Sequence, residues 1–404
     1  MQQTTVFPSL ILLLFTLASS QLATAQAAAF YDEGEAREGW YRSYDMATWV
    51  AKGGNPRLIE EILARVEASE GERHHPELVD TKIDYLAGNW AYEWVQAGDS
   101  ARREADRLQG VARLNKLKEA LAYYSTGSWP HLGRPDDRRA YEKAVETYLL
   151  AGQLLPVPVA HVPLQVGDEQ VNGYLHLPEG EGPFPLVINS FGSDVSKEDS
   201  FDLFARELMP RGIAMMAVDM PGLGEASHLS MADGSDAVME GALQWAREAA
   251  DIDNDRLFVV GGSFGGNAAA RAFYRFELAG VVSMCGPLHS PFLAPPEFLD
   301  QLPRLTIEGV KSRYKVLGEP TTTLTAITPN TSLLEQGLMG SGNTVDTPLL
   351  VITTNRDPVA PLQDLELLLA DASNEQVIIL DMDGHCPPRT VREPIIARWI
   401  EDQL

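Results

Sequence analysis

The chain has 404 residues, of which 45% are hydrophobic, and this is enough to bury a large core and to form two structural units. Its 57 acidic residues against 32 Lys and Arg give a formal charge of -25. This charge would repel a polyanion, so we exclude nucleic acid as a partner.

The beginning of the chain has the pattern of an export signal. The apolar run Val6–Leu17 is shorter than a membrane-spanning helix. Ala23 and Ala25 are small residues at the positions that a signal peptidase reads. We expect a signal peptide over residues 1–25, export to the periplasm or the medium, and no stable membrane insertion after cleavage. An uncleaved anchor stays open as the alternative, because the first residues carry no Lys or Arg.

Residues 26–155 are predicted to form an all-helical domain. Asn55 and Pro56 are a typical cap and first-turn pair. The apolar residues that follow at helical spacing are Leu58, Ile59, Ile62, Leu63 and Val66. Later segments repeat this spacing with aromatic residues such as Trp90 and Trp94. Such residues usually face other helices, so we expect them in a core and not in a ligand site.

Residues 156–404 have the pattern of an α/β domain with a mostly parallel central sheet. Two strand-like runs flank a turn at residues 166–169 and predict a β-hairpin. The apolar runs that then alternate with helical stretches are PLVINSFG, IAMMAVDM, RLFVVGGS, GVVSMCG, PLLVITT and QVIILDM. Residues 287–345 are too long for a simple connection, and we expect a partly helical insertion over the carboxyl edge of the sheet.

One serine lies where a nucleophile is expected. The stretch Gly261–Gly265 matches the pattern G-x-S-x-G around Ser263. An apolar strand run precedes it and an alanine-rich helical run follows, so Ser263 falls on a strand-to-helix turn that exposes its hydroxyl. The amino end of a helix also favours developing negative charge. We therefore predict that Ser263 is a nucleophile.

A serine hydroxyl needs a neighbouring base, and an acid and a histidine follow the later strands. Asp357 comes just after PLLVITT, and His385 comes just after QVIILDM. The chain order Ser, Asp, His is that of the α/β-hydrolase fold. Asp364 competes with Asp357, whereas Asp381 and Asp383 precede the histidine too closely to reach its far nitrogen.

The oxyanion of a tetrahedral intermediate needs two backbone donors. Phe264 supplies one because it follows the nucleophile, and the loop after the first long parallel strand supplies the other from Gly192 or Ser193. No spacing of His, Cys and carboxylates suggests a metal site, and the chemistry needs no cofactor. Cys285 and Cys386 each follow a predicted strand, so we expect them near the same edge of the sheet. They could form a disulfide that braces the histidine loop or remain two free thiols, and the sequence leaves both alternatives open.

Several motifs together carry a resemblance to a known family. They follow the helical segment in the chain and are VNGYLHLP, VINSFGSDVSKEDSF, AVDMPGLGE, GGSFGG, NRDPVAP and DGHC. From Tyr41 onward the chain resembles the FrsA-like α/β-hydrolases, which are esterases and carbon–carbon bond hydrolases with a helical domain ahead of the hydrolase core. The resemblance implies the triad Ser263, Asp357 and His385 and a helical domain that roofs the active site. It also implies that Asp194 binds substrate, since it stands where the carbon–carbon hydrolases have a Glu.

The function expected from these residues is hydrolysis of a small carboxylic ester through an acyl-enzyme. The alternatives are a carbon–carbon bond hydrolase of aryl diketone-like substrates, a serine peptidase, and a non-catalytic interaction protein of the same fold. Whether the chain forms a homodimer stays open.

Overall fold

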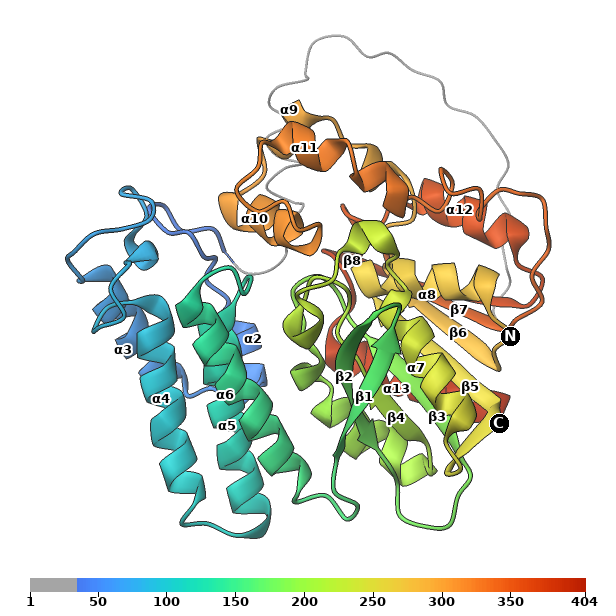
Figure 1. Ribbon diagram of the computed structural model, residues 1–404, viewed down its shortest axis with the longest axis horizontal. Coiled ribbons are helices and arrows are strands. Elements are labelled where there is room, and N and C mark those ends of the chain that lie inside the picture. The colour runs from blue at the N-terminus through green and yellow to red at the C-terminus, as the bar shows by residue number, and fades with distance from the viewer. Residues whose placement is uncertain (1–34) are drawn as a thin grey trace.

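The computed structural model describes residues 35–404 of the chain. The signal peptide predicted for residues 1–25 therefore lies outside the described residues. Figure 1 shows a group of long helices at one side and a sheet flanked by helices at the other. Among the described residues, no helix has both the length and the apolar character needed to cross a membrane.

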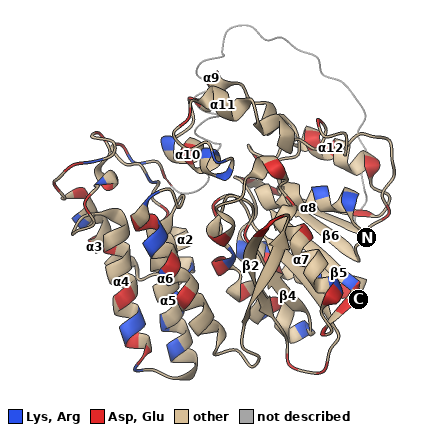
Figure 2. Ribbon diagram, viewed as in Figure 1, with Lys and Arg blue, Asp and Glu red and all other residues tan. Residues whose placement is uncertain are grey.

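The N-terminal part is built from helices and the loops between them. Its α-helices are α2 (Met46–Ala51), α3 (Pro56–Glu67), α4 (Trp90–Ala105), α5 (Gly110–Ser128) and α6 (Pro135–Gly152). The side chain of Asn55 caps α3 by accepting hydrogen bonds from the backbone N–H groups of Arg57 and Leu58. Trp90 and Trp94 are buried with ring centroids 5.3 Å apart, so the aromatic stripe belongs to the core. Both acidic and basic residues lie along α4, α5 and α6 (Figure 2).

The second part is built on an eight-stranded sheet with the order β1-β2-β4-β3-β5-β6-β7-β8. The strands are β1 (Ala160–Val166), β2 (Glu169–His176), β3 (Phe184–Ser190), β4 (Ala214–Ala217), β5 (Ile252–Gly262), β6 (Gly280–Met284), β7 (Leu349–Arg356) and β8 (Glu375–Asp383). The strands β1 and β2 form the predicted hairpin, and β2 is also antiparallel to β4. All other neighbours are parallel, as the unbroken apolar runs predict.

Helices cover both faces of the sheet, and the side chains of each central strand alternate between them. On β3, Leu186 and Ile188 pack on the face covered by α7 (Ala237–Glu248), α8 (Phe264–Arg275) and α12 (Leu362–Asp371). Val187 between them packs on the opposite face, with α13 (Arg389–Gln403). A strand buried on both sides has no polar face, which is why the sequence shows continuous apolar runs here.

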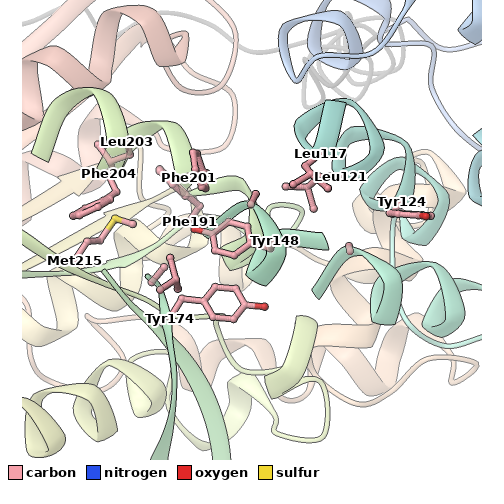
Figure 3. Close-up of a cluster of buried hydrophobic side chains, with 14 of the residues drawn as sticks. Leu117, Leu121, Tyr124, Tyr148, Tyr174, Phe191, Phe201, Leu203, Phe204 and Met215 are labelled. Carbon is pink, nitrogen blue, oxygen red and sulfur yellow. The ribbon is translucent and has the colours of Figure 1, made fainter. Parts of the chain in front are cut away.

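The helical part and the sheet share one core. Tyr148 of α6 stacks on Tyr174 of β2, with ring centroids 4.5 Å apart, and its edge meets Phe201. Figure 3 shows Leu117 and Leu121 of α5 in the same cluster as these rings. The apolar contact is continuous, so the two parts are expected to unfold together.

The segment between β6 and β7, residues 287–345, lies over the carboxyl edge of the sheet, and we call it the cover (Figure 1). It contains the short helices α9 (Pro296–Leu299), α10 (Arg304–Arg313) and α11 (Thr321–Thr325). Carboxyl edges of parallel strands are the usual place for ligands in α/β folds.

Candidate active site

Ser263 lies between the end of β5 and the start of α8, in a conformation rare for residues other than glycine. Its φ is 56° and its ψ is -128°. A Cβ added to Gly261 would overlap the carbonyl oxygen of Gly265, and one added to Gly265 would overlap the backbone of the loop after β3. Both glycines of the G-x-S-x-G pattern are therefore needed for the sharp turn that presents the serine.

The structure brings the three predicted triad residues together. His385 Nε2 lies 2.7 Å from Ser263 Oγ, and His385 Nδ1 lies 2.9 and 3.0 Å from the two carboxylate oxygens of Asp357. The carboxylate also accepts hydrogen bonds from the backbone N–H groups of Val359 and Ala360, which fix its position. These distances are those of a nucleophile, a base and the residue that orients the base.

The competing carboxylates have other partners. Asp364 accepts hydrogen bonds from the backbone N–H groups of His289 and Ser290. Asp381 and Asp383 both pair with Arg356 at the edge of the sheet. Of the carboxylates considered from the sequence, Asp357 is therefore the one beside His385.

A disulfide joins Cys285 and Cys386, whose Cα atoms are 5.4 Å apart. Cys386 follows the histidine, and Cys285 follows Met284, whose carbonyl accepts a hydrogen bond from the N–H of Ser263. Of the two states left open by the sequence, the structure has the disulfide, and it ties the histidine loop to the strand beside the nucleophile. Across residues 35–404, the grouping with metal-ligand spacing is Cys285, His385 and Cys386, and its two sulfurs are bonded to each other.

The predicted oxyanion residues lie around Ser263. Phe264 is the first residue of α8, so its N–H has no acceptor within the helix. A Cβ added to Gly192 would lie 2.6 Å from Ser263 Cβ, which shows how closely the loop after β3 approaches the serine. Ser193 and Asp194 continue this loop, and both line the cavity above the serine. The Ser193 hydroxyl donates a hydrogen bond to the carboxylate of Asp194 at 2.8 Å.

The cavity measures about 790 Å³, including its opening to solvent, and is largely apolar. Ser263 and His385 lie in its wall. The apolar lining residues are Phe264, Pro291, Phe292, Leu299, Leu302, Ile307, Val310, Tyr314, Leu324 and Val359. Most of these belong to the cover, and the sequence does not identify them, because a short amphipathic helix carries no catalytic motif.

The helical part contacts the cover but stays outside the cavity wall. None of the cavity-lining residues comes from the described residues 35–155. The helical part instead holds α10, because Tyr41 Oη donates a hydrogen bond to Glu308 Oε2 at 2.7 Å. The expectation that the helical domain roofs the active site is therefore refined: among the described residues, the helical part contacts α10 of the cover and contributes no side chain to the cavity wall.

A cluster of charged residues, Lys197, Asp219 and Glu225, holds the loop after β3 in place. Lys197 Nζ is fully buried and lies 2.7 Å from carboxylate oxygens of both Asp219 and Glu225. Burial alone would lower the pKa of Lys197, but the surrounding carboxylates outweigh it and raise the pKa. The backbone N–H of Lys197 also donates to Asp219. The cluster joins the loop after β3 to the turn after β4, a role that the sequence pattern did not reveal.

The family assignment follows from comparison with known sequences. A family profile described as Esterase FrsA-like matches residues 15–404. The chain belongs to the FrsA-like esterase family. Esterase FrsA of Vibrio cholerae serotype O1 is 31% identical over 374 residues, which is 92% of this chain and 89% of that protein. Esterase FrsA of Photobacterium profundum is 30% identical over 397 residues, which is 95% of this chain and 93% of that protein.

Solved structures share the fold. The structure of the 2,6-dihydroxy-pseudo-oxynicotine hydrolase aligns with a TM-score of 0.68 and 21% identity, over 88% of this chain and 94% of that one. AbyA5 aligns with a TM-score of 0.62 and 20% identity, over 86% of this chain and 98% of that one. The coverage shows that the likeness includes the helical part, and these structures confirm the predicted α/β-hydrolase fold. The predicted FrsA-like resemblance is confirmed by the family profile and the sequence relatives.

Proposed function

We propose that this chain is a serine esterase that hydrolyses small carboxylic esters through an acyl-enzyme. In this proposal Ser263 is the nucleophile, His385 is the general base and acid, and Asp357 orients the histidine. Membership of the FrsA-like esterase family supports hydrolysis of an ester. The observation that carries the proposal is the unbroken series of contacts, at 2.7 Å from Ser263 to His385 and 2.9 Å from His385 to Asp357, in the wall of an apolar cavity.

The geometry supports the following sequence of steps. His385 donates its Nδ1–H to Asp357, which leaves Nε2 free to accept the proton of the Ser263 hydroxyl. The serine oxygen attacks the ester carbonyl carbon, and backbone N–H groups of Phe264 and of the loop after β3 stabilise the resulting oxyanion. The imidazolium then protonates the leaving alcohol. A water molecule deprotonated by the same histidine attacks the acyl-enzyme and releases the acid.

The cavity favours esters with an apolar group. Aliphatic and aromatic side chains from the cover and from Phe264 surround the space above the serine. Burial of each methylene group in an apolar pocket stabilises the bound substrate and transition state by about 0.8 kcal/mol. We therefore expect kcat/KM to rise with the length of the apolar group until the cavity is full. A series of p-nitrophenyl esters of increasing acyl length measures this directly.

Substitution of the nucleophile tests the proposal. Ser263→Ala is expected to lower kcat for short aryl esters by at least about a thousandfold, because no acyl-enzyme can form. Retained activity in Ser263→Ala would show that another residue is the nucleophile. Absence of hydrolysis by the unsubstituted protein over a broad ester and peptide panel would favour a non-catalytic interaction protein instead.

A second candidate, carbon–carbon bond hydrolysis of an aryl diketone, is favoured by one observation. Asp194 lines the cavity two positions beyond Gly192, where its carboxylate can meet a polar substituent of the substrate. Turnover of an aryl diketone that is lost in Asp194→Asn, while short-ester hydrolysis is kept, would establish this second activity. Equal effects of Asp194→Asn on both substrates would contradict it.

We also propose that the protein is exported after cleavage of residues 1–25. The disulfide between Cys285 and Cys386 supports this, because structural disulfides form and persist in oxidising compartments. N-terminal sequencing of the protein recovered outside the cytoplasm is expected to begin at Gln26. An intact N-terminus on a cytoplasmic protein would contradict the proposal.

A further inference from the structure

Arg313, the last residue of α10, is a buried cation at the meeting point of several segments. Only 1% of its surface is exposed. Its guanidinium donates hydrogen bonds to main-chain carbonyls, from Nε to Ser193 at 2.7 Å, from Nη2 to Pro130 at 2.7 Å and from Nη1 to Gly222 at 3.3 Å. Nη1 also donates to the hydroxyl of Ser312 at 2.6 Å. An arginine side chain presents five N–H donors in one plane, so a single guanidinium can hold several acceptors in a fixed arrangement.

The acceptors come from three separate parts of the fold. Ser193 belongs to the loop after β3 that touches the nucleophile, and Gly222 belongs to the turn after β4. Pro130 lies between α5 and α6 in the helical part. Arg313 itself stands on α10, which lines the cavity through Ile307 and Val310. One rigid, planar group thus joins the cover, the helical part and the loop beside the serine.

The bond to the Ser193 carbonyl sets the direction of a backbone donor. A peptide group is planar, so holding the carbonyl of Ser193 also fixes the N–H of Asp194 in the same peptide unit. The preceding unit is held separately, because Val195 donates its N–H to the carbonyl of Gly192 at 3.4 Å. Arg313 therefore orients the part of the loop that lines the cavity just beyond the nucleophile.

We propose that Arg313 is a positioning residue that holds the loop after β3 in the arrangement needed to stabilise the oxyanion, and that it couples this loop to the docking of the cover. The proposal rests on the proposed function of Ser263. Arg313 is not among the residues that line the cavity, and in this proposal it acts on the reaction through the carbonyl of Ser193. Because the oxyanion forms only after attack, loss of this support affects the transition state more than substrate binding.

The test compares Arg313→Lys and Arg313→Met with the unsubstituted protein. Lysine keeps the positive charge but lacks the planar fork, and methionine keeps much of the volume without any donor. For a short aryl ester we expect kcat to fall by about 10- to 100-fold in Arg313→Met, less in Arg313→Lys, with KM changed by less than about threefold. An alkyl boronic acid, which forms a tetrahedral adduct on the serine, should bind more weakly by the same factor as kcat/KM falls.

Arg42 offers a matched control. It is equally buried, in the helical part, and donates from Nε to the carbonyl of Trp129 at 2.9 Å, one residue before Pro130. Arg42→Lys is expected to lower the Tm while leaving kcat and boronic acid affinity unchanged below that temperature. This control separates a general loss of packing at the junction from the loss of support for the loop.

Three results would overturn the proposal. The first is a folded Arg313→Lys or Arg313→Met with unchanged kcat, and the second is a rise in KM at constant kcat. The third is an equal fall of kcat in Arg42→Lys. If Arg313→Met does not fold, Arg313→Lys alone decides between these outcomes. Loss of activity in Ser263→Ala shows that the esterase proposal holds whatever the Arg313 variants do.

Discussion

Gly192 lies against Ser263, and its lack of a side chain is what allows the loop after β3 to come so close. An added Cβ would lie 2.6 Å from Ser263 Cβ and 2.9 Å from Ser263 Oγ. Non-bonded carbon atoms pack at about 3.5 to 4.0 Å, so either the loop or the serine would have to move. Such a movement would displace the hydroxyl from His385 or the backbone donors from the oxyanion.

We predict that Gly192→Ala lowers kcat by about 100-fold or more and leaves the Tm nearly unchanged, since one misplaced oxyanion donor costs that much. Steady-state kinetics and thermal melting measure the two effects. Gly309→Ala is the matched control, because its nearest neighbour would be an oxygen of Asp194 at 3.7 Å, an ordinary contact. Full activity in Gly192→Ala would mean that the loop has room and does not take part.

At the scale of single residues, the sequence predicted the positions of those side chains that belong to a strong local pattern. Ser263, Asp357 and His385 each come directly after an apolar strand run, and the carboxyl ends of parallel strands meet at one edge. Arg313 and Lys197 could not be placed in this way. Their partners are carbonyls and carboxylates far away in the chain, and no local spacing records such contacts.

At the scale of elements, the loop that carries His385 is attached at two points. The disulfide joins Cys386 to Cys285 after β6, and Thr354 Oγ1 donates a hydrogen bond to the carbonyl of Gly384 at 2.7 Å. The loop after β8 is thus connected to β7, its neighbour in the sheet, and to the end of β6, the strand beyond β7. A disulfide and a hydrogen bond, and not packing alone, therefore hold His385 close to Ser263.

Loss of the disulfide is predicted to cost both stability and activity. The bond closes a loop with a sequence separation of 101 residues. Its removal in Cys285→Ser/Cys386→Ser is expected to lower the free energy of unfolding by about 2–4 kcal/mol. It should also reduce kcat, because the histidine loop becomes free to move. Urea unfolding, kinetics and a thiol count with and without reductant measure these effects; two titratable thiols in the native, unreduced protein would contradict the bond.

The strands were easier to predict than the helices of the cover. The central strands are buried on both faces and therefore appear as continuous apolar runs such as Leu257–Val260. The helices α9 and α11 have 4 and 5 residues, which is too short for a 3.6-residue periodicity to become visible. The cavity that they enclose depended on tertiary packing and lay beyond sequence patterns.

At the scale of the whole molecule, Glu308 on α10 joins the cover to the helical part. It accepts the hydrogen bond from Tyr41 and lies 3.8 Å from His131. Burial alone would raise the pKa of Glu308, but His131 and Tyr41 outweigh it and lower the pKa to about 2. Burial lowers the pKa of His131 itself, so at neutral pH the carboxylate is stabilised by the hydrogen bond from Tyr41 and by Arg304, whose Nη1 lies 3.9 Å from Glu308 Oε1.

The sign of the pH dependence follows from this lowered pKa. An unfolded Glu has a pKa of about 4.3, so Glu308 stabilises the fold above that pH, and the contribution is lost as the pH falls toward 2. We predict that Glu308→Gln lowers the Tm at pH 7 and that the difference from the unsubstituted protein shrinks below pH 4. Glu77→Gln, at an exposed carboxylate near Arg304, should leave the Tm unchanged at both pH values. A Tm difference for Glu308→Gln that is the same at pH 7 and pH 3 would contradict the assignment.

The whole molecule places one serine hydroxyl, 2.7 Å from one imidazole nitrogen, in the wall of an apolar cavity under the cover. The most direct measurement is the site of covalent labelling by an alkyl fluorophosphonate, located by peptide mass spectrometry. We predict one modified residue, Ser263, with labelling strongly slowed in His385→Ala and absent in Ser263→Ala. Labelling at another residue, or equal labelling of the Ser263→Ala protein, would contradict the central claim that this serine is the nucleophile.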